Sequence, residues 1–159
     1  MQETAEEMST MEFLNLDACT VNKLHPVLTG LATHLDVRKA TVQLLLLVKR
    51  YPLTTSHTAG TRKCAVCPMC QTEPETTVHF LLHCPALQHH RIKFLIPILE
   101  SCRENRIPVD PPAVIKAILD PTAVPKPEKT YLKLCRDFVF KLHSERSVNL
   151  GGESEYKRL

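Results

Sequence analysis

The sequence of 159 residues contains no tryptophan, few aromatic side chains and no long apolar run. Aromatic residues make up 5% of the chain, so a core built mainly from Leu, Ile and Val would gain stability from a bound metal ion. The longest aliphatic run, Leu44–Val48, is far shorter than the roughly 20 apolar residues of a membrane-spanning helix. We therefore expect a protein that does not enter a membrane.

The chain also lacks a signal peptide pattern and an even number of cysteines. Residues 1–12 are acidic and have no basic segment followed by an apolar one, and the total of seven cysteines is odd. These features favour reduced thiols, so we expect an intracellular location, in the nucleus or cytoplasm. No spacing of Ser, His, Asp or Cys indicates a catalytic nucleophile. We expect no enzymatic activity and no small-molecule substrate.

Four residues between positions 64 and 84 have the spacing of a closed zinc site. Cys67 and Cys70 form a C-x2-C pair, and His79 and Cys84 follow as H-x4-C. A two-residue gap lets two thiolates of one turn contact one ion, and a structural Zn²⁺ takes its other two ligands from a later segment. Four such ligands leave no open position for water, so we expect a structural rather than a catalytic zinc ion.

Two neighbouring residues are alternative ligands. Cys64 lies at C-x2-C spacing from Cys67, so the cysteines could bind in either of two registers. His83 lies one helical turn after His79, which makes a pair of histidines geometrically possible. Cys84 is favoured over His83 because the proline that follows it moves its backbone away from the helical region.

The Cys67-Pro-Met-Cys70 string is also a C-P-x-C sequence, which is typical of thioredoxin-like oxidoreductases. That redox chemistry needs a thiol of lowered pKa at a helix N-terminus, usually after a strand in a βαβ unit. The residues around the string show no pattern of a sheet. The sequence therefore favours metal binding over a redox-active dithiol.

Apolar periodicity predicts a mostly α-helical fold, a small helical domain with a zinc knuckle at its centre. A helix from about Val37 to Arg50 would begin after an N-cap at Asp36 and bury a stripe of Val37, Ala40, Leu44, Leu47 and Val48. Further helices are expected from Thr76 or Thr77 to just before Cys84, from about Leu87 with an interruption at Pro97, over Ala113–Leu119, and from Glu128 to about Ser147.

These elements predict one domain with two terminal extensions. The helical zinc-binding domain would span 34–147, with the knuckle at 64–85. Residues 1–33 would form a poorly defined lead-in and residues 148–159 a flexible tail. The last helix would bury one face, made of Tyr131, Leu134, Cys135, Phe138 and Leu142.

Positive charge is concentrated before the knuckle, although the net charge is only +3. No acidic residue lies between Val37 and Lys63, whereas this stretch contains Arg38, Lys39, Lys49, Arg50, Arg62 and Lys63. A local excess of cations is a feature of proteins that bind a phosphate backbone, although a solvated helix face and a loop would carry the same charge. These six residues are therefore candidates for binding RNA or DNA.

The knuckle sequence resembles the zinc-binding segment near the C-terminus of non-LTR (LINE-like) retrotransposon polyproteins. In that family a C-x2-C pair, an acidic-Thr step and H-x4-C, often with a following proline, come after the reverse transcriptase. The same order occurs here as Cys67-Pro-Met-Cys70, Glu75-Thr76 and His79-Phe-Leu-Leu-His-Cys84-Pro85. The resemblance covers roughly residues 34–147. Outside the knuckle it rests on three segments: Lys49-Arg50-Tyr51-Pro52-Leu53, Ile118-Leu-Asp-Pro121 and Leu142-His143-Ser-Glu-Arg146.

The resemblance implies a segment that helps to hold template RNA or target DNA near a polymerase. The chain has no Tyr-x-Asp-Asp polymerase motif and no set of spaced carboxylates suited to two-metal phosphoryl chemistry. We therefore expect a zinc-stabilised nucleic-acid-binding module without polymerase activity. One alternative is a structural or protein-interaction zinc domain that contacts a protein partner through the last helix, near Phe138 and Leu142. The other is a non-functional retroelement fragment.

Overall fold

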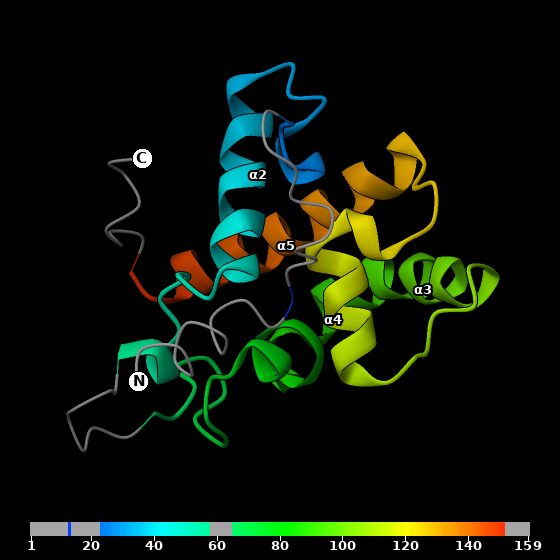
Figure 1. Ribbon diagram of the computed structural model, residues 1–159. Helices are drawn as coiled ribbons and strands as arrows, with labels where there is room; N and C mark the ends of the chain where they lie inside the picture. The colour runs from blue at the N-terminus through cyan, green and yellow to red at the C-terminus, as the bar shows by residue number, and fades with distance from the viewer. Residues whose placement is uncertain (1–12, 14–22, 58–64, 152–159) are drawn as a thin grey trace, which may run out of the picture.

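The computed structural model describes residues 13, 23–57 and 65–151, and within these ranges the fold is helical (Figure 1). The main helices are α2 (His34–Leu47), α3 (Gln88–Glu104), α4 (Pro111–Leu119) and α5 (Lys129–Asn149). Short 3-10 turns lie at Pro26–Leu28, Thr54–His57, Pro85–Leu87 and Pro121–Ala123, and a π-helical turn lies at His79–His83. The described residues form no strand, only an isolated bridge between Val66 and Pro74. The predicted mostly α-helical class is confirmed.

Helix α5 is the element on which the other helices are assembled. Both α2 and α3 pack against it, and α4 packs against α2 and α3 (Figure 1). The predicted face of α5 is buried at four positions, and Leu134 is half-buried. Phe138 and Leu142 are fully buried in the core, so the expectation that they would form a docking surface is wrong. Their apolar area is already covered by the chain's own helices.

Helix α2 begins three residues earlier than the sequence predicts. Thr33 is the N-cap, and Asp36 is the third helical residue of a capping box: the Asp36 amide donates to Thr33 Oγ1 at 3.1 Å, and the Thr33 amide donates to the Asp36 carboxylate at 2.9 Å. The predicted stripe is correct at Ala40 and Leu47 but wrong at Val37, which is 47% exposed. The buried face of α2 also includes a polar residue, Gln43. Its side-chain amide donates to the Ile118 carbonyl at 2.8 Å.

Helix α3 continues through Pro97, where the sequence predicted an interruption. Proline has no amide hydrogen, so the carbonyl of Lys93, four residues earlier, loses its helical donor. Lys93 lies on the exposed side of the helix, where water can supply a hydrogen bond instead. Burial of Ile98 and Cys102 on the opposite side stabilises the helix beyond the proline.

Residues before α2 pack on α5 through a buried arginine. Arg136 donates to the carbonyls of Val27 at 2.8 Å and Thr29 at 2.6 Å. Val27 is fully buried. The domain boundaries at 33 and 148 stay predictions, because most of the lead-in and the tail lie outside the described residues.

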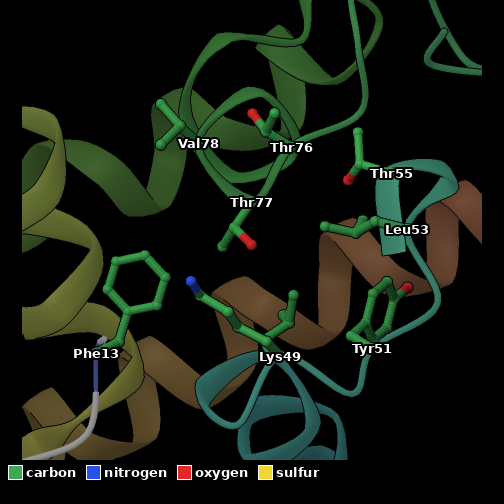
Figure 2. Close-up of a pocket in the computed structure, with 9 residues that line it drawn as sticks. Phe13, Lys49, Tyr51, Leu53, Thr55, Thr76, Thr77 and Val78 are labelled. Atoms are coloured by element: carbon green, nitrogen blue, oxygen red, sulfur yellow. The ribbon is translucent and has the colours of Figure 1, made fainter. Parts of the chain in front are cut away.

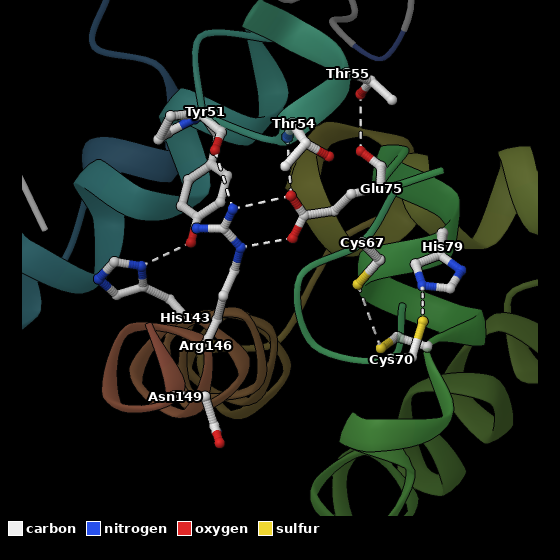
Figure 3. A network of polar contacts seen from close by, with 12 residues as sticks. Tyr51, Thr54, Thr55, Cys67, Cys70, Glu75, His79, His143, Arg146 and Asn149 are labelled. Carbon is white, nitrogen blue, oxygen red and sulfur yellow. Dashed lines mark hydrogen bonds and ion pairs between the residues drawn. The ribbon is translucent and has the colours of Figure 1, made fainter. Parts of the chain in front are cut away.

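A buried ion pair fastens the knuckle to α5 (Figure 3). Arg146 donates from Nε to Glu75 Oε1 at 2.6 Å and from a terminal nitrogen to Oε2 at 2.9 Å. The side chain of Glu75 is fully buried and that of Arg146 is 8% exposed. The backbone amide of Thr54 adds a hydrogen bond to Oε2 at 2.9 Å. This carboxylate therefore joins three segments: the knuckle, the chain after α2, and α5.

The same network reaches the end of α2 through Tyr51. Its hydroxyl is 2.8 Å from Nδ1 of His143 on α5, and its ring stacks on Phe80 of the π-helical turn with centroids 5.6 Å apart. Burial, aided by the charges of Arg146 and Arg38, lowers the pKa of His143 to about 4. The imidazole is therefore neutral at pH 7 and adds no charge beside Arg146.

Replacing Glu75 by glutamine should destabilise the protein strongly, because it leaves the Arg146 guanidinium buried without its counterion. We expect the free energy of unfolding, measured by urea denaturation, to fall by about 3–5 kcal/mol. Lys133→Gln is the control, since Lys133 is 71% exposed where it pairs with Asp137. That change should cost less than about 1 kcal/mol. Equal losses in the two variants would contradict the anchoring role of Glu75.

Candidate metal centre

The C-x2-C pair lies in a tight turn closed by backbone hydrogen bonds. The Cys67 amide donates to the Glu73 carbonyl at 2.7 Å, and the Glu75 amide donates to the Ala65 carbonyl at 3.0 Å. Within the turn, the Gln71 amide donates to the Cys67 carbonyl at 2.8 Å, and Gln71 has a positive φ of 58°. These bonds bring both sulfur atoms to the same side of the turn.

The other two side chains come from the π-helical turn His79–His83 and the residue after it. The Cys84 amide donates to the His79 carbonyl at 2.7 Å, which is an i to i+5 hydrogen bond. In an α-helix, residues five positions apart do not share a face. The wider π turn therefore brings His79 and Cys84 to the same side. The prediction that Cys84 follows the end of this helix is confirmed, since Cys84 is its C-cap.

The four predicted ligands meet in one cluster. Donor atoms of Cys67, Cys70, His79 and Cys84 all lie within 4.8 Å of one another. The Cys67 and Cys84 sulfurs are 3.9 Å apart, and Cys70 Sγ is 3.3 Å from His79 Nε2. Tetrahedral coordination with ordinary zinc bond lengths needs about 3.8 Å between two sulfurs and about 3.6 Å between sulfur and nitrogen. The cluster could therefore hold a metal ion.

The environment of the cluster suits a closed centre. Cys67, His79 and Cys84 are at most 3% exposed, whereas Cys70 is half-buried. Nδ1 of His79 donates to the Glu73 carboxylate at 3.1 Å, which leaves the lone pair of Nε2 facing the sulfurs. A carboxylate partner of this kind orients histidine ligands in many metal sites. Glu73 was not singled out in the sequence, although its position between the C-x2-C pair and the histidine is a usable signal.

The three thiols differ in acidity without a metal ion. Burial raises the pKa of Cys67 and, with the charge of Cys67, raises the pKa of Cys84 to about 12. Burial has the same effect at Cys70, but hydrogen bonds from the Thr72 hydroxyl and nearby amides outweigh it and lower the pKa to about 6. Three thiolates at this spacing therefore need a cation, which a bound metal ion supplies.

The two alternative ligands have different outcomes. His83 is exposed and is not part of the cluster. Cys64 lies outside the described residues, so the second cysteine register stays open. The described cysteines of the knuckle are free thiols, and the only β pairing near them is the isolated Val66–Pro74 bridge. This region of the described chain therefore has no βαβ unit of the kind that a thioredoxin-like site requires.

The four candidate basic residues that the structure describes lie in two places, with Arg38 and Lys39 in the first half of α2 and Lys49 and Arg50 just after its end. Lys39 is 2.6 Å from the Asp137 carboxylate, and the guanidinium of Arg38 lies over the Phe140 ring, 5.8 Å from its centroid. Arg50, at the other end of α2, is exposed. Arg62 and Lys63 lie outside the described residues.

Lys49 ends α2 in a left-handed conformation, with a φ of 53°. Its amide donates to the Leu46 carbonyl and the Arg50 amide to the Leu45 carbonyl, the two bonds of a Schellman motif. A cavity of about 270 Å³ separates this end of α2 from residues 76–78 of the knuckle. Figure 2 shows the Lys49 side chain extending into this space, with its ammonium nitrogen beside the Phe13 ring, 5.6 Å from the ring centroid. One cation of the basic run therefore lies next to the knuckle.

Comparison with models of protein families, with curated proteins and with solved structures finds no match. Within the described ranges, no helix combines the length and the hydropathy needed to cross a membrane. The site is therefore interpreted from its own geometry and from the sequence.

Cys84→Ser should abolish metal binding, because it removes one of four donors from a closed site. Elemental analysis of protein purified without added metal should find one bound ion per chain in the unmodified protein and in Cys102→Ser. Cys102 is an equally buried thiol on α3 outside the cluster, which makes it a matched control. Cys64→Ser should also keep the ion. Metal loss in Cys64→Ser and retention in Cys84→Ser would contradict this ligand set.

Proposed function

We propose that the chain is a non-enzymatic module stabilised by a structural Zn²⁺ ion and that it binds nucleic acid. The observation that carries the zinc assignment is the convergence of three cysteine sulfurs and one imidazole nitrogen within 4.8 Å. Soft thiolate ligands with an imidazole favour zinc over hard cations such as Mg²⁺ or Ca²⁺. Four protein donors fill a tetrahedral site, so no position is left for a reactive water.

Three features support nucleic acid as the partner. The knuckle resembles a segment that follows retrotransposon reverse transcriptases, and a run of cations without acids precedes it in the sequence. The end of α2, with Lys49 and the exposed Arg50, adjoins the knuckle across a cavity. Contacts between such cations and phosphates give affinity with little sequence preference.

The structure narrows the set of residues that we propose as phosphate contacts. Lys39 is already paired with Asp137, which reduces its attraction for a phosphate. The guanidinium of Arg38 lies over the Phe140 ring. We therefore assign the main contacts to Lys49 and Arg50, just after the end of α2, and to Arg62 and Lys63, which precede the knuckle in the sequence.

Charge reversal at Arg50, Arg62 and Lys63 should weaken binding to single-stranded RNA or duplex DNA. The affinity would be measured at several salt concentrations by fluorescence anisotropy. Each lost phosphate contact should reduce the slope of log K against log salt by about 0.7–0.9. Loss of three contacts should therefore reduce the slope by about 2–3.

The control is charge reversal at Lys93, Arg103 and Lys129, three exposed cations on α3 and α5 that change the net charge equally. This variant should keep most of the salt dependence. Equal losses in the two triple variants would show that only net charge matters and would refute the assigned surface. A zinc-loaded wild-type protein that binds neither nucleic acid would refute nucleic-acid binding altogether.

One observation favours a protein partner as a second candidate. Ile92 and Ile96 lie one turn apart on α3 and are 49% and 54% exposed. Adjacent exposed isoleucines on one helix face are typical of contact with another apolar surface. In this case zinc would serve only to close the fold, and α3, rather than α5, would carry the interface.

A further inference from the structure

Arg91 is an almost fully buried cation beside the metal cluster. Its side chain lies on the first turn of α3, and the residue is 1% exposed. It donates from Nε to the Leu81 carbonyl at 2.8 Å and from a terminal nitrogen to the carbonyl of the ligand Cys84 at 3.0 Å. The other terminal nitrogen donates to Gln88 Oε1 at 2.7 Å. Arg91 therefore holds both ends of the segment that leads to Cys84.

Within the described residues, Arg91 has no carboxylate partner. Its hydrogen bonds go to two backbone carbonyls and one amide oxygen, all of them uncharged. The other buried arginines differ: Arg146 contacts Glu75, and the charges of Asp36 and Asp137 act on Arg136. Burying a guanidinium without an opposite charge costs several kcal/mol. Hydrogen bonds to carbonyls reduce this cost but do not neutralise the charge.

A loaded centre would supply the missing charge. Binding of a divalent ion deprotonates the three cysteines and leaves the histidine neutral. Three thiolates and one divalent cation sum to a single negative charge. Arg91 carries one positive charge and is hydrogen-bonded to the backbone of the ligand Cys84. The two charges are equal and opposite, and Arg91 and three of the four ligands are buried.

We propose that Arg91 is the countercharge of the metal centre and a positioning residue for Cys84. This inference rests on the proposed zinc site, but it adds a preference: the charges of Arg91, the four ligands and the ion cancel only with three thiolates and a divalent ion. A centre with two thiolates and two histidines would be uncharged and would gain nothing from the charge of Arg91.

The test is the zinc affinity of Arg91→Gln, measured by competition with a chelator at fixed pH. Outer-shell partners of metal ligands typically contribute 10–100-fold in affinity, and we expect a loss in this range. Arg91→Lys keeps the charge and should retain more affinity than Arg91→Gln. Arg136→Gln is the matched control, because Arg136 is also buried and donates to carbonyls away from the cluster. It should leave the affinity nearly unchanged.

Repeating the measurement in a Cys70→His variant distinguishes the effect of the Arg91 charge from the effect of its packing. Cys70 is half-buried, so Cys70→His can place a second imidazole and make the centre neutral. In that background, Arg91→Gln should lower zinc affinity by a smaller factor than in the unmodified chain, because only the positioning of Cys84 remains to be lost. The same loss in both backgrounds would overturn the countercharge proposal. A wild-type chain that binds no zinc would instead refute the proposed function itself.

Discussion

Three cysteine thiols and one imidazole lie within 4.8 Å of one another, and this crowding constrains the rest of the knuckle. Ionised thiolates at such distances repel, so the arrangement favours either protonated thiols or a bound cation. In the described chain, the turn that carries Cys67 and Cys70 is stabilised by an isolated bridge, a few backbone hydrogen bonds and the Thr54 hydroxyl, which donates to the Ala65 carbonyl. A metal ion would join this turn directly to the π-helical segment.

The knuckle is not an appendage of the helical domain. Glu75 connects it to α5 through Arg146, and Arg91 on α3 binds the carbonyl of Cys84. Tyr51, at the end of α2, packs on Phe80 of the π-helical turn. Each main contact between the knuckle and the helices therefore lies within a few residues of a candidate ligand. Metal binding and packing of the helices should consequently stabilise each other.

Three segments that are far apart in the sequence also meet in space. Tyr51 follows the basic end of α2, Glu75 belongs to the acidic-Thr step, and Arg146 comes from the last helix. In the structure they form one buried network (Figure 3). This network would fix the basic end of α2 relative to the metal centre.

Local features of the structure were predictable from the sequence, whereas long-range ones were not. The convergence of the four candidate ligands could be predicted because spacing within a short segment limits the possible geometry, and helices could be predicted from apolar periodicity. The position of the α2 N-cap was missed because Thr33 and Asp36 are both good capping residues. The burial of Gln43 and Arg91 could not be predicted, because residue type alone does not show whether a particular polar side chain is buried. Their partners come from other elements of the fold.

X-ray absorption spectroscopy of the purified, metal-loaded protein at the zinc edge would identify the atoms that surround the bound ion. We expect about three sulfur neighbours at 2.3 Å and one nitrogen neighbour at 2.0–2.1 Å, with no bound water. A shell dominated by oxygen or nitrogen, or a folded protein without zinc, would contradict this expectation.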